Sequence, residues 1–312
     1  MKEKILITGG AGYIGSLLCD YLINEGYTIT VVDNLMYRQN SLLNCCYSKN
    51  FNFVNTDVCN FAEINNLIKK HDIIIPLAAI VGAPACKKYN HLIKSINYDS
   101  NINILKNLSN NQLAIFPTTN SGYGVGDKND FCTEESELKP VSEYGKLKVE
   151  IEKKYLDSGN AVTLRLATVF GMSPRMRTDL LVNDFVLKAL KDRSLILFEE
   201  NFRRNFIHIR DVVRTFQFVI ENQNKMINET YNVGLSSANL TKLQLAEKIK
   251  TFLPDTYIHT AKIGEDPDKR DYLVSNKKLE KLGWSPKYNL DDGIKELITG
   301  YKIIQINNYS NI

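Results

Sequence analysis

Short apolar runs alternate with longer amphipathic stretches through the first half of the chain. Continuous apolar runs predict strands at 4–8, 28–32, 51–55, 73–77, 113–118 and 161–166. Apolar residues at helical spacing predict helices between them, at 12–26, 62–70, 93–108 and 142–158. Strands that are apolar throughout and separated by helices are typical of a parallel sheet covered on both faces. Because the crossovers of such sheets are right-handed, the pattern predicts a doubly wound α/β fold.

The pattern loosens after residue 170. Helices are predicted at 180–191, 212–222 and 241–252, with shorter elements between them. We expect residues 171–304 to form a smaller α/β lobe over the carboxyl ends of the strands, where ligands of such folds bind. Residues 1–170 then form the first domain, completed by a strand and a helix from the C-terminal half. The Asn-rich tail, 305–312, is expected to fray.

Three glycines, Gly9, Gly12 and Gly15, follow the first predicted strand and open the first helix. Glycine permits a tight turn, and the N–H groups that begin a helix attract a pyrophosphate. The second strand leads to Asp33, whose carboxylate can bind both ribose hydroxyls of adenosine and repels a 2′-phosphate. No basic residue follows before Arg38. The sequence therefore predicts a Rossmann-type domain that binds NAD in preference to NADP.

Tyr144 and Lys148 stand four residues apart on the predicted helix 142–158, so their side chains share one face. A free tyrosine, with a pKa near 10, is a weak base at neutral pH. An ammonium group about 4 Å away contributes roughly 4 kcal/mol at an effective dielectric constant of about 20, which lowers the tyrosine pKa by roughly three units less the cost of desolvation. Thr119 follows the fifth strand, at the same sheet edge. The pattern predicts that Thr119 orients a substrate oxygen and that Tyr144 removes its proton.

Composition limits the functional classes. The 312 residues are 44% hydrophobic, enough for one large domain or two associated ones. The net charge of +4 comes from dispersed residues, which argues against a nucleic-acid partner. No apolar run reaches the length of a membrane span, and the early first strand leaves no room for a signal peptide. The six cysteines lack metal-binding spacing, and they indicate reduced thiols in a cytoplasmic protein without a metal site.

Together these motifs resemble the extended short-chain dehydrogenase/reductase family, in its branch of sugar-nucleotide epimerases and dehydratases. The resemblance extends to about Tyr288. It implies an NAD-binding first domain, a nucleotide-sugar-binding lobe, and Thr119, Tyr144 and Lys148 as the catalytic residues. The cofactor-binding residues that it implies are Gly9, Gly12, Tyr13, Ile14, Gly15, Asp33, Asn34, Asp57, Val58, Leu77, Ala78, Ala79, Asn97, Tyr144 and Lys148.

Two arginine segments of the second half, 204–212 and 268–272, resemble the family's sites for the nucleotide-sugar diphosphate. Guanidinium groups bind phosphate oxygens in bidentate fashion, so the two segments are expected to converge on that group. His208, within an apolar strand, is expected to be structural. The substrate-binding residues expected are Ser121, Asn183, Arg175, Arg204 and Arg270.

Where this chain departs from the family's patterns, it limits the reactions that the protein is expected to catalyse. The 4,6-dehydratases carry an acid pair directly after the catalytic threonine, where this chain has Asn120 and Ser121. The 3,5-epimerase/reductases need NADPH and a Cys/His pair, and no cysteine or histidine here clearly fills those roles. Of the family's reactions, the one that remains is NAD-dependent oxidation of the sugar at C4. The segment 171–185 resembles bacterial enzymes of capsule and surface-polysaccharide synthesis, which favours release of the 4-ketone of GDP-D-glycero-D-manno-heptose.

Several alternatives stay open. A UDP-hexose 4-epimerase would form the same ketone transiently and reduce it from the other face. A protein that binds NAD without catalysis would typically have lost Tyr144 or Lys148. The resemblance also implies a homodimer or homotetramer, in which helices 93–108 and 142–158 pair with their two-fold copies.

Overall fold

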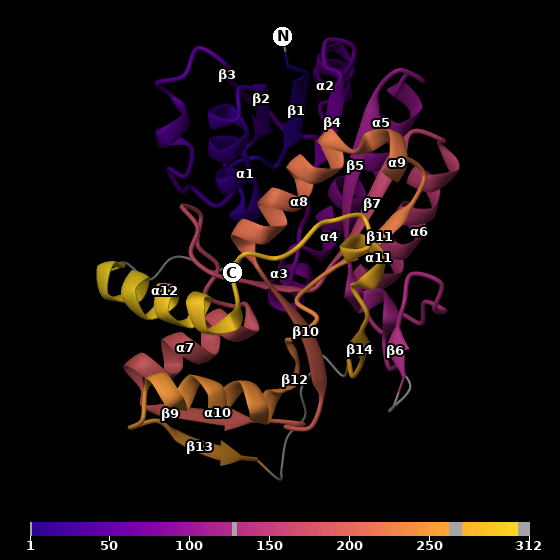
Figure 1. Cartoon of the computed structure of the whole chain (residues 1–312). Helices are drawn as coiled ribbons and strands as arrows, with labels where there is room; N and C mark the ends of the chain where they lie inside the picture. The colour runs from indigo at the N-terminus through magenta and orange to yellow at the C-terminus, as the bar shows by residue number, and fades with distance from the viewer. Residues whose placement is uncertain (1, 127–129, 262–269, 305–312) are drawn as a thin grey trace.

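The computed structural model describes residues 2–126, 130–261 and 270–304. Its centre is a seven-stranded parallel sheet in the order β11-β7-β5-β4-β1-β2-β3 (Figure 1). The strands are β1 (Lys4–Thr8), β2 (Thr28–Asp33), β3 (Phe51–Asn55), β4 (Ile73–Pro76), β5 (Leu113–Thr119), β7 (Ala161–Leu166) and β11 (Thr230–Val233). The predicted doubly wound α/β fold is confirmed.

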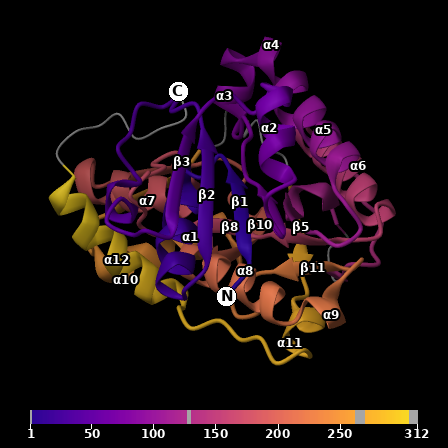
Figure 2. The same ribbon diagram turned by 90° about the horizontal axis from the view of Figure 1, so that it is seen from above.

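Helices cover both faces of the sheet, as Figure 2 shows. One face carries α1 (Tyr13–Asn24) and α8 (Ile209–Glu221), and the other carries α2 (Phe61–Ile68), α5 (Ser100–Asn107) and α6 (Glu143–Asp157). Successive side chains of β1 point to opposite faces of the sheet, as they do in any strand. Ile5 and Ile7 belong to the core under α1, whereas Leu6 packs with Ile64 of α2.

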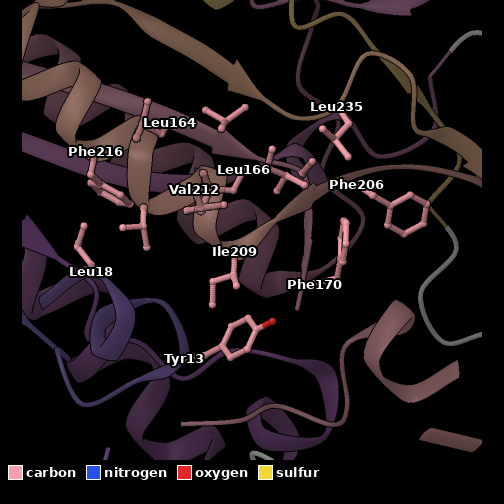
Figure 3. Close-up of a cluster of buried hydrophobic side chains, with 14 of the residues drawn as sticks. Tyr13, Leu18, Leu164, Leu166, Phe170, Phe206, Ile209, Val212, Phe216 and Leu235 are labelled. Carbon is pink, nitrogen blue, oxygen red and sulfur yellow. The ribbon is translucent and has the colours of Figure 1, made fainter. Parts of the chain in front are cut away.

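The largest buried cluster joins the two halves of the chain (Figure 3). Leu18 of α1 and Leu164 of β7 belong to it together with Phe216 of α8. Phe206, on a strand of the smaller lobe, is also a member. The lobe therefore shares its core with the sheet, which fixes its position over the carboxyl ends of the strands.

The smaller lobe consists of short sheets and three helices (Figure 1). The sheets are β12 (Asn239–Thr241), β10 (Arg203–His208) and β8 (Thr168–Phe170); β13 (Tyr257–Thr260) and β9 (Ser194–Leu197); and β14 (Leu273–Val274) and β6 (Phe131–Cys132). The helices α7 (Leu181–Lys191), α10 (Lys242–Phe252) and α12 (Leu290–Ile303) pack against one another. Short helices connect the larger elements: η1 (Leu43–Cys45), α3 (Ala83–Lys88), η3 (Asn120–Tyr123), α9 (Gln223–Met226) and α11 (Lys277–Glu280).

The predicted helix 93–108 is divided in the structure. α4 (Asn90–Ile93) leads into a π-helical stretch, η2 (Lys94–Asp99), and then into α5. The Ser100 hydroxyl donates to the carbonyl oxygen of Ile96 at 2.5 Å, and Asn97 turns its amide to the backbone of Ile80. Side-chain bonds to the backbone compete with regular helical bonds, so apolar spacing alone does not reveal the wide turn.

The described residues contain no helix long and apolar enough to cross a membrane. They also contain no group of three His, Cys, Asp or Glu side chains that could hold a metal ion. All six cysteines lie within the described residues, and none of them forms a disulfide there. The predicted frayed tail, 305–312, lies outside the described residues.

Candidate active site

A groove open to solvent lies where β1, β2 and β4 end. The residues that follow these strands form its wall, because carboxyl ends of parallel strands meet at one sheet edge. Nine of the predicted cofactor residues line it: Gly9, Gly12, Asp33, Asn34, Asp57, Val58, Leu77, Ala78 and Ala79.

The glycine turn fits a bound pyrophosphate. Gly9 has a φ of +70°, and a Cβ there would lie 2.5 Å from the backbone nitrogen of Ala78. A Cβ on Gly15 would lie 2.6 Å from the Cα of Gly10, so glycine is needed for α1 to pack against the turn. Among the described residues, no side chain caps the start of α1 at Gly12. The first N–H groups of this helix are therefore available to an anionic ligand.

Asp33 is held rigidly at the end of β2. Its Oδ2 accepts from the Ala11 N–H at 3.0 Å, and its Oδ1 accepts from the Leu35 N–H at 2.8 Å. Burial raises the pKa of this carboxyl, and the two N–H bonds act against that rise. Asn34 donates to Asp57 at 2.9 Å. These bonds fix both predicted acids in the wall of the groove.

The side chains of three residues that were predicted to bind the cofactor contact other parts of the protein. The Tyr13 hydroxyl donates to the Gly171 carbonyl oxygen at 2.7 Å, and Ile14 packs against the main core. Asn97 is 3% exposed and bonds both the N–H and the carbonyl of Ile80. Ile80 itself lines the groove. Asn97 is therefore placed to act on a cofactor through the backbone that it holds.

The predicted catalytic residues gather at the end of β5. Tyr144 lies in the first turn of α6, whose N-cap, Ser142, accepts from the Gly145 N–H at 3.1 Å. The Thr119 hydroxyl lies 2.9 Å from that of Ser121 and accepts from the Ser121 N–H at 3.1 Å. The short helix η3, which begins directly after Thr119, packs on α6. The structure thus brings Thr119, Ser121 and the start of α6 together.

The expected activation of Tyr144 by Lys148 is absent from this structure. Burial raises the pKa of Tyr144 to about 12, and the charges that act against this rise are those of Arg177 and Arg270. The Lys148 ammonium donates instead to the Pro117 carbonyl oxygen at 3.1 Å, and burial lowers its own pKa to about 8. In the absence of ligands, the cost of burying the Tyr144 phenolate therefore exceeds the stabilisation that its neighbouring charges supply. Spacing fixes the helix face that two side chains share, but not the direction in which the ammonium points.

Arg204 and Arg270 both lie near Tyr272. The Arg204 guanidinium, 3% exposed on β10, is 5.8 Å from the centre of the Tyr272 ring. Arg270 precedes Tyr272 by two residues, and its charge reaches Tyr144. The structure therefore places the Arg270 charge where it acts on Tyr144. Residues 268–269 of the same predicted segment lie outside the described residues.

Two other residues that were predicted to bind the substrate contact different parts of the protein. Asn183 is fully buried, and its side chain bonds the Tyr13 hydroxyl at 3.2 Å and the Gly171 N–H at 3.0 Å. Arg175 is 2% exposed and lines the cofactor groove beside Asp33. Asn183 thus joins α1 to the smaller lobe, and Arg175 belongs to the wall of the cofactor groove.

Arg177 is a further functional candidate, outside the set of substrate-binding residues expected from the sequence. Its guanidinium forms an ion pair with Asp179. A Cβ on Gly82, in the loop after β4, would lie 3.2 Å from Arg177 Nη2. Its charge opposes the raised pKa of Tyr144 more strongly than that of Arg270. Only the folded chain brings these groups together, so local sequence spacing carries no signal for this arginine.

His208 has the structural surroundings that were expected. It is 1% exposed, and its Nε2 lies 2.9 Å from a carboxylate oxygen of Glu296 on α12. Its ring stacks on Tyr288, with 4.8 Å between the ring centres. His208 thereby fastens the C-terminal helix to β10.

The glycine-lined groove, the parallel sheet and the Tyr144/Lys148 pair on α6 define a dinucleotide-dependent enzyme of the extended short-chain dehydrogenase/reductase class. The chain belongs to the NAD dependent epimerase/dehydratase family, whose pattern matches residues 5–234. It is therefore an enzyme with NAD as its cofactor and with nucleotide-sugar epimerase/dehydratase chemistry.

The proteins that are similar to this chain over nearly its whole length are named for several different activities. The chain is 29% identical over 309 residues to an uncharacterized UDP-glucose epimerase of Bacillus subtilis, with 93% of this chain and 95% of that protein covered. It is 28% identical over 318 residues to UDP-glucuronic acid decarboxylase 1 of Arabidopsis thaliana, with 96% and 70% covered. The solved structure of UDP-glucose 4-epimerase from Thermotoga maritima, with UDP-glucose, matches with a TM-score of 0.80 at 25% identity, covering 96% and 99%.

Proposed function

We propose that the protein is a 4-epimerase of a UDP-linked hexose. It oxidises C4 of the sugar and then reduces the ketone from the opposite face. The observation that carries this proposal is that the chain has Thr119, Tyr144 and Lys148, while Asn120 and Ser121 stand directly after Thr119, where elimination of water would need acidic side chains. The UDP-glucose epimerases among the similar proteins support the same choice.

NAD, when bound, supplies reversible hydride uptake at the sugar carbon. Tyr144 takes the proton of the C4 hydroxyl as the C4–H bond breaks, and it returns this proton to the oxygen when the epimer forms. The Thr119 hydroxyl holds the C4 oxygen. Because the Tyr144 pKa of about 12 makes a phenolate scarce at neutral pH, nearby cations must assist. Arg177 supplies one such charge, and Lys148 supplies another if its ammonium turns away from the carbonyl that it binds here.

The other site residues hold the two ligands. Asp33 binds the ribose hydroxyls of the cofactor's adenosine, and the glycine turn binds its pyrophosphate. Arg204 and Arg270 bind the diphosphate of the sugar nucleotide through charge-assisted hydrogen bonds. This arrangement places the sugar beside Tyr144 and the nucleotide base in the smaller lobe.

A second candidate is oxidation without return of the hydride. The segment 171–185 resembles bacterial polysaccharide enzymes that release the 4-ketone of GDP-D-glycero-D-manno-heptose. This segment carries Arg175 and Arg177, which lie at the cofactor groove and near Tyr144. The same catalytic residues would serve both reactions, so the fate of the ketone separates the two candidates.

A screen of UDP-, GDP-, CDP- and dTDP-sugars tests the proposal. Each is incubated with the enzyme, NADH absorbance is followed, and the products are separated by chromatography. We expect UDP-glucose to yield UDP-galactose without net NADH. Net NADH and a ketone from the GDP-linked heptose would establish the second candidate instead, and a 4-keto-6-deoxy product would refute both.

A further inference from the structure

The π-helical turn η2 contributes to the wall of the cofactor groove. Ile96, on this turn, is one of the residues that line the groove. The neighbouring Asn97 bonds both backbone groups of Ile80, which lines the same groove. Single turns of this wide kind occur frequently at functional sites. The position of η2 therefore decides where two parts of the groove wall lie.

Two side chains from the first turn of α5 hold this wide turn. The Ser100 hydroxyl donates to the Ile96 carbonyl oxygen at 2.5 Å. The Asn101 amide nitrogen donates to the Asn97 carbonyl oxygen at 2.9 Å. Both side chains are buried, so little water is at hand to replace these bonds. The two carbonyl groups that they hold belong to the residues of η2 that shape the groove.

Asn101 is in turn fixed from α6, the helix that carries Tyr144. The Tyr155 hydroxyl of α6 donates to Asn101 Oδ1 at 3.0 Å, and this bond is buried. Both ends of the Asn101 amide are thus engaged, the nitrogen by Asn97 and the oxygen by Tyr155. The Tyr155 ring is fully buried and stacks on Phe116 of β5, with 4.5 Å between the ring centres. The central sheet therefore supports the ring whose hydroxyl holds Asn101.

We propose that Tyr155 and Asn101 are positioning residues for the cofactor. The Tyr155 hydroxyl fixes the Asn101 amide, and the amide fixes the wide turn η2. This turn then holds Ile96 and the backbone of Ile80 in the places where they meet bound NAD. Both positioning residues act through η2 rather than by contact with the cofactor. Because α6 also carries the proposed catalytic residues, the same bonds set the position of that helix relative to the cofactor.

Titration calorimetry of the full chain, freed of nucleotide, tests the proposal with NAD. Tyr155→Phe removes only the hydroxyl and should weaken NAD binding about fivefold or more, the factor that one ordinary hydrogen bond supplies. Asn101→Leu releases the Asn97 carbonyl directly and should weaken NAD binding at least as much. Tyr98→Phe is the matched control, because the Tyr98 hydroxyl also joins η2 to α6, at Glu150, but on the exposed side. Its NAD affinity should stay within about twofold of wild type.

The double variant Asn101→Leu/Tyr155→Phe separates positioning from a loss of stability. Each single variant leaves one buried polar group of the pair without its partner, whereas the double variant removes both groups. The double variant should therefore regain most of the free energy of unfolding that Tyr155→Phe loses, while its NAD affinity stays low. Recovery of NAD affinity together with stability would mean that Tyr155 serves the fold alone, and the proposal would be wrong.

Two other outcomes would overturn the proposal. NAD affinities within about twofold of wild type in both single variants would show that η2 keeps its place without these bonds. An equal loss in Tyr98→Phe would mean that any contact between η2 and α6 has the same effect. Because NAD is the only ligand titrated, the result does not depend on which sugar nucleotide the enzyme uses.

Discussion

Lys148 carries a charge that destabilises the ligand-free fold. Its ammonium is buried, and its pKa of about 8 lies below the usual lysine value of 10.5. The folded state therefore binds fewer protons than the unfolded state between these two pH values. The penalty is complete below pH 8 and disappears as the pH rises to about 10.5. The catalytic role that we propose for Lys148 would therefore come at a cost in stability.

Lys148→Met should stabilise the ligand-free protein at pH 7 by roughly 1–3 kcal/mol while abolishing turnover. The stabilisation should shrink to near zero at about pH 10.5, since the wild-type lysine is then neutral in both states. Urea unfolding at the two pH values measures this. Lys146→Met, on the exposed face of the same helix, is the matched control and should change stability little. A loss of stability at pH 7 in Lys148→Met would contradict the burial account.

We expect Arg204 to bind the diphosphate of the nucleotide sugar. Arg204→Met should weaken UDP binding about tenfold or more and leave NAD binding unchanged, because a partly desolvated charge contact to phosphate is lost. Calorimetric titration with UDP and NAD gives both values. Arg193→Met removes an exposed arginine of the same lobe and serves as the control. Unchanged UDP affinity in both Arg204→Met and Arg270→Met would show that the diphosphate binds elsewhere.

At the scale of elements, α6 is tied to the sheet by a buried ion pair. Arg165 of β7 lies 2.6 Å from Glu152 of α6, and both side chains are less than 10% exposed. Arg165 also donates to the Tyr123 hydroxyl of η3 at 3.0 Å. One guanidinium therefore connects the helix that carries Tyr144 to the turn that follows Thr119.

Removing one partner of this pair should be costly. Arg165→Met leaves the Glu152 carboxylate buried without its ion pair, and the free energy of unfolding should fall by about 3 kcal/mol or more. The double variant Arg165→Met/Glu152→Met should recover a large part of that loss. Denaturant unfolding of the single and double variants forms the test. A single variant that loses less than about 1 kcal/mol would mean that the pair does not hold α6.

Local signals explain which elements were predictable. Apolar runs located six of the seven strands of the central sheet, and glycine spacing located the groove. The helix α12 was not predicted, although Asn289 and Asp292 form a capping box before a periodic apolar run. The direction of the Lys148 ammonium and the placing of Arg175 depend on contacts between distant segments. Spacing along the chain holds no information on such contacts, so neither position could be predicted from the sequence.

At the scale of the whole molecule, α5 and α6 lie side by side on one face of the sheet (Figure 2). We expect this face to pair with its two-fold copy and form an isologous interface. Light scattering at micromolar concentration should then give at least twice the chain mass of 35.5 kDa. A species of one chain mass under these conditions would contradict this arrangement.

The central claim is that Tyr144 transfers the proton while the sugar is oxidised by NAD. Single-turnover mixing of UDP-glucose with the NAD-loaded enzyme, followed at the NADH absorbance, tests it most directly. Wild type should show a transient rise as the 4-ketone forms. Tyr144→Phe should lower the rate of that rise by about 10² to 10⁴-fold, with UDP and NAD affinities nearly unchanged. A Tyr144→Phe enzyme that forms NADH as fast as wild type would contradict the account.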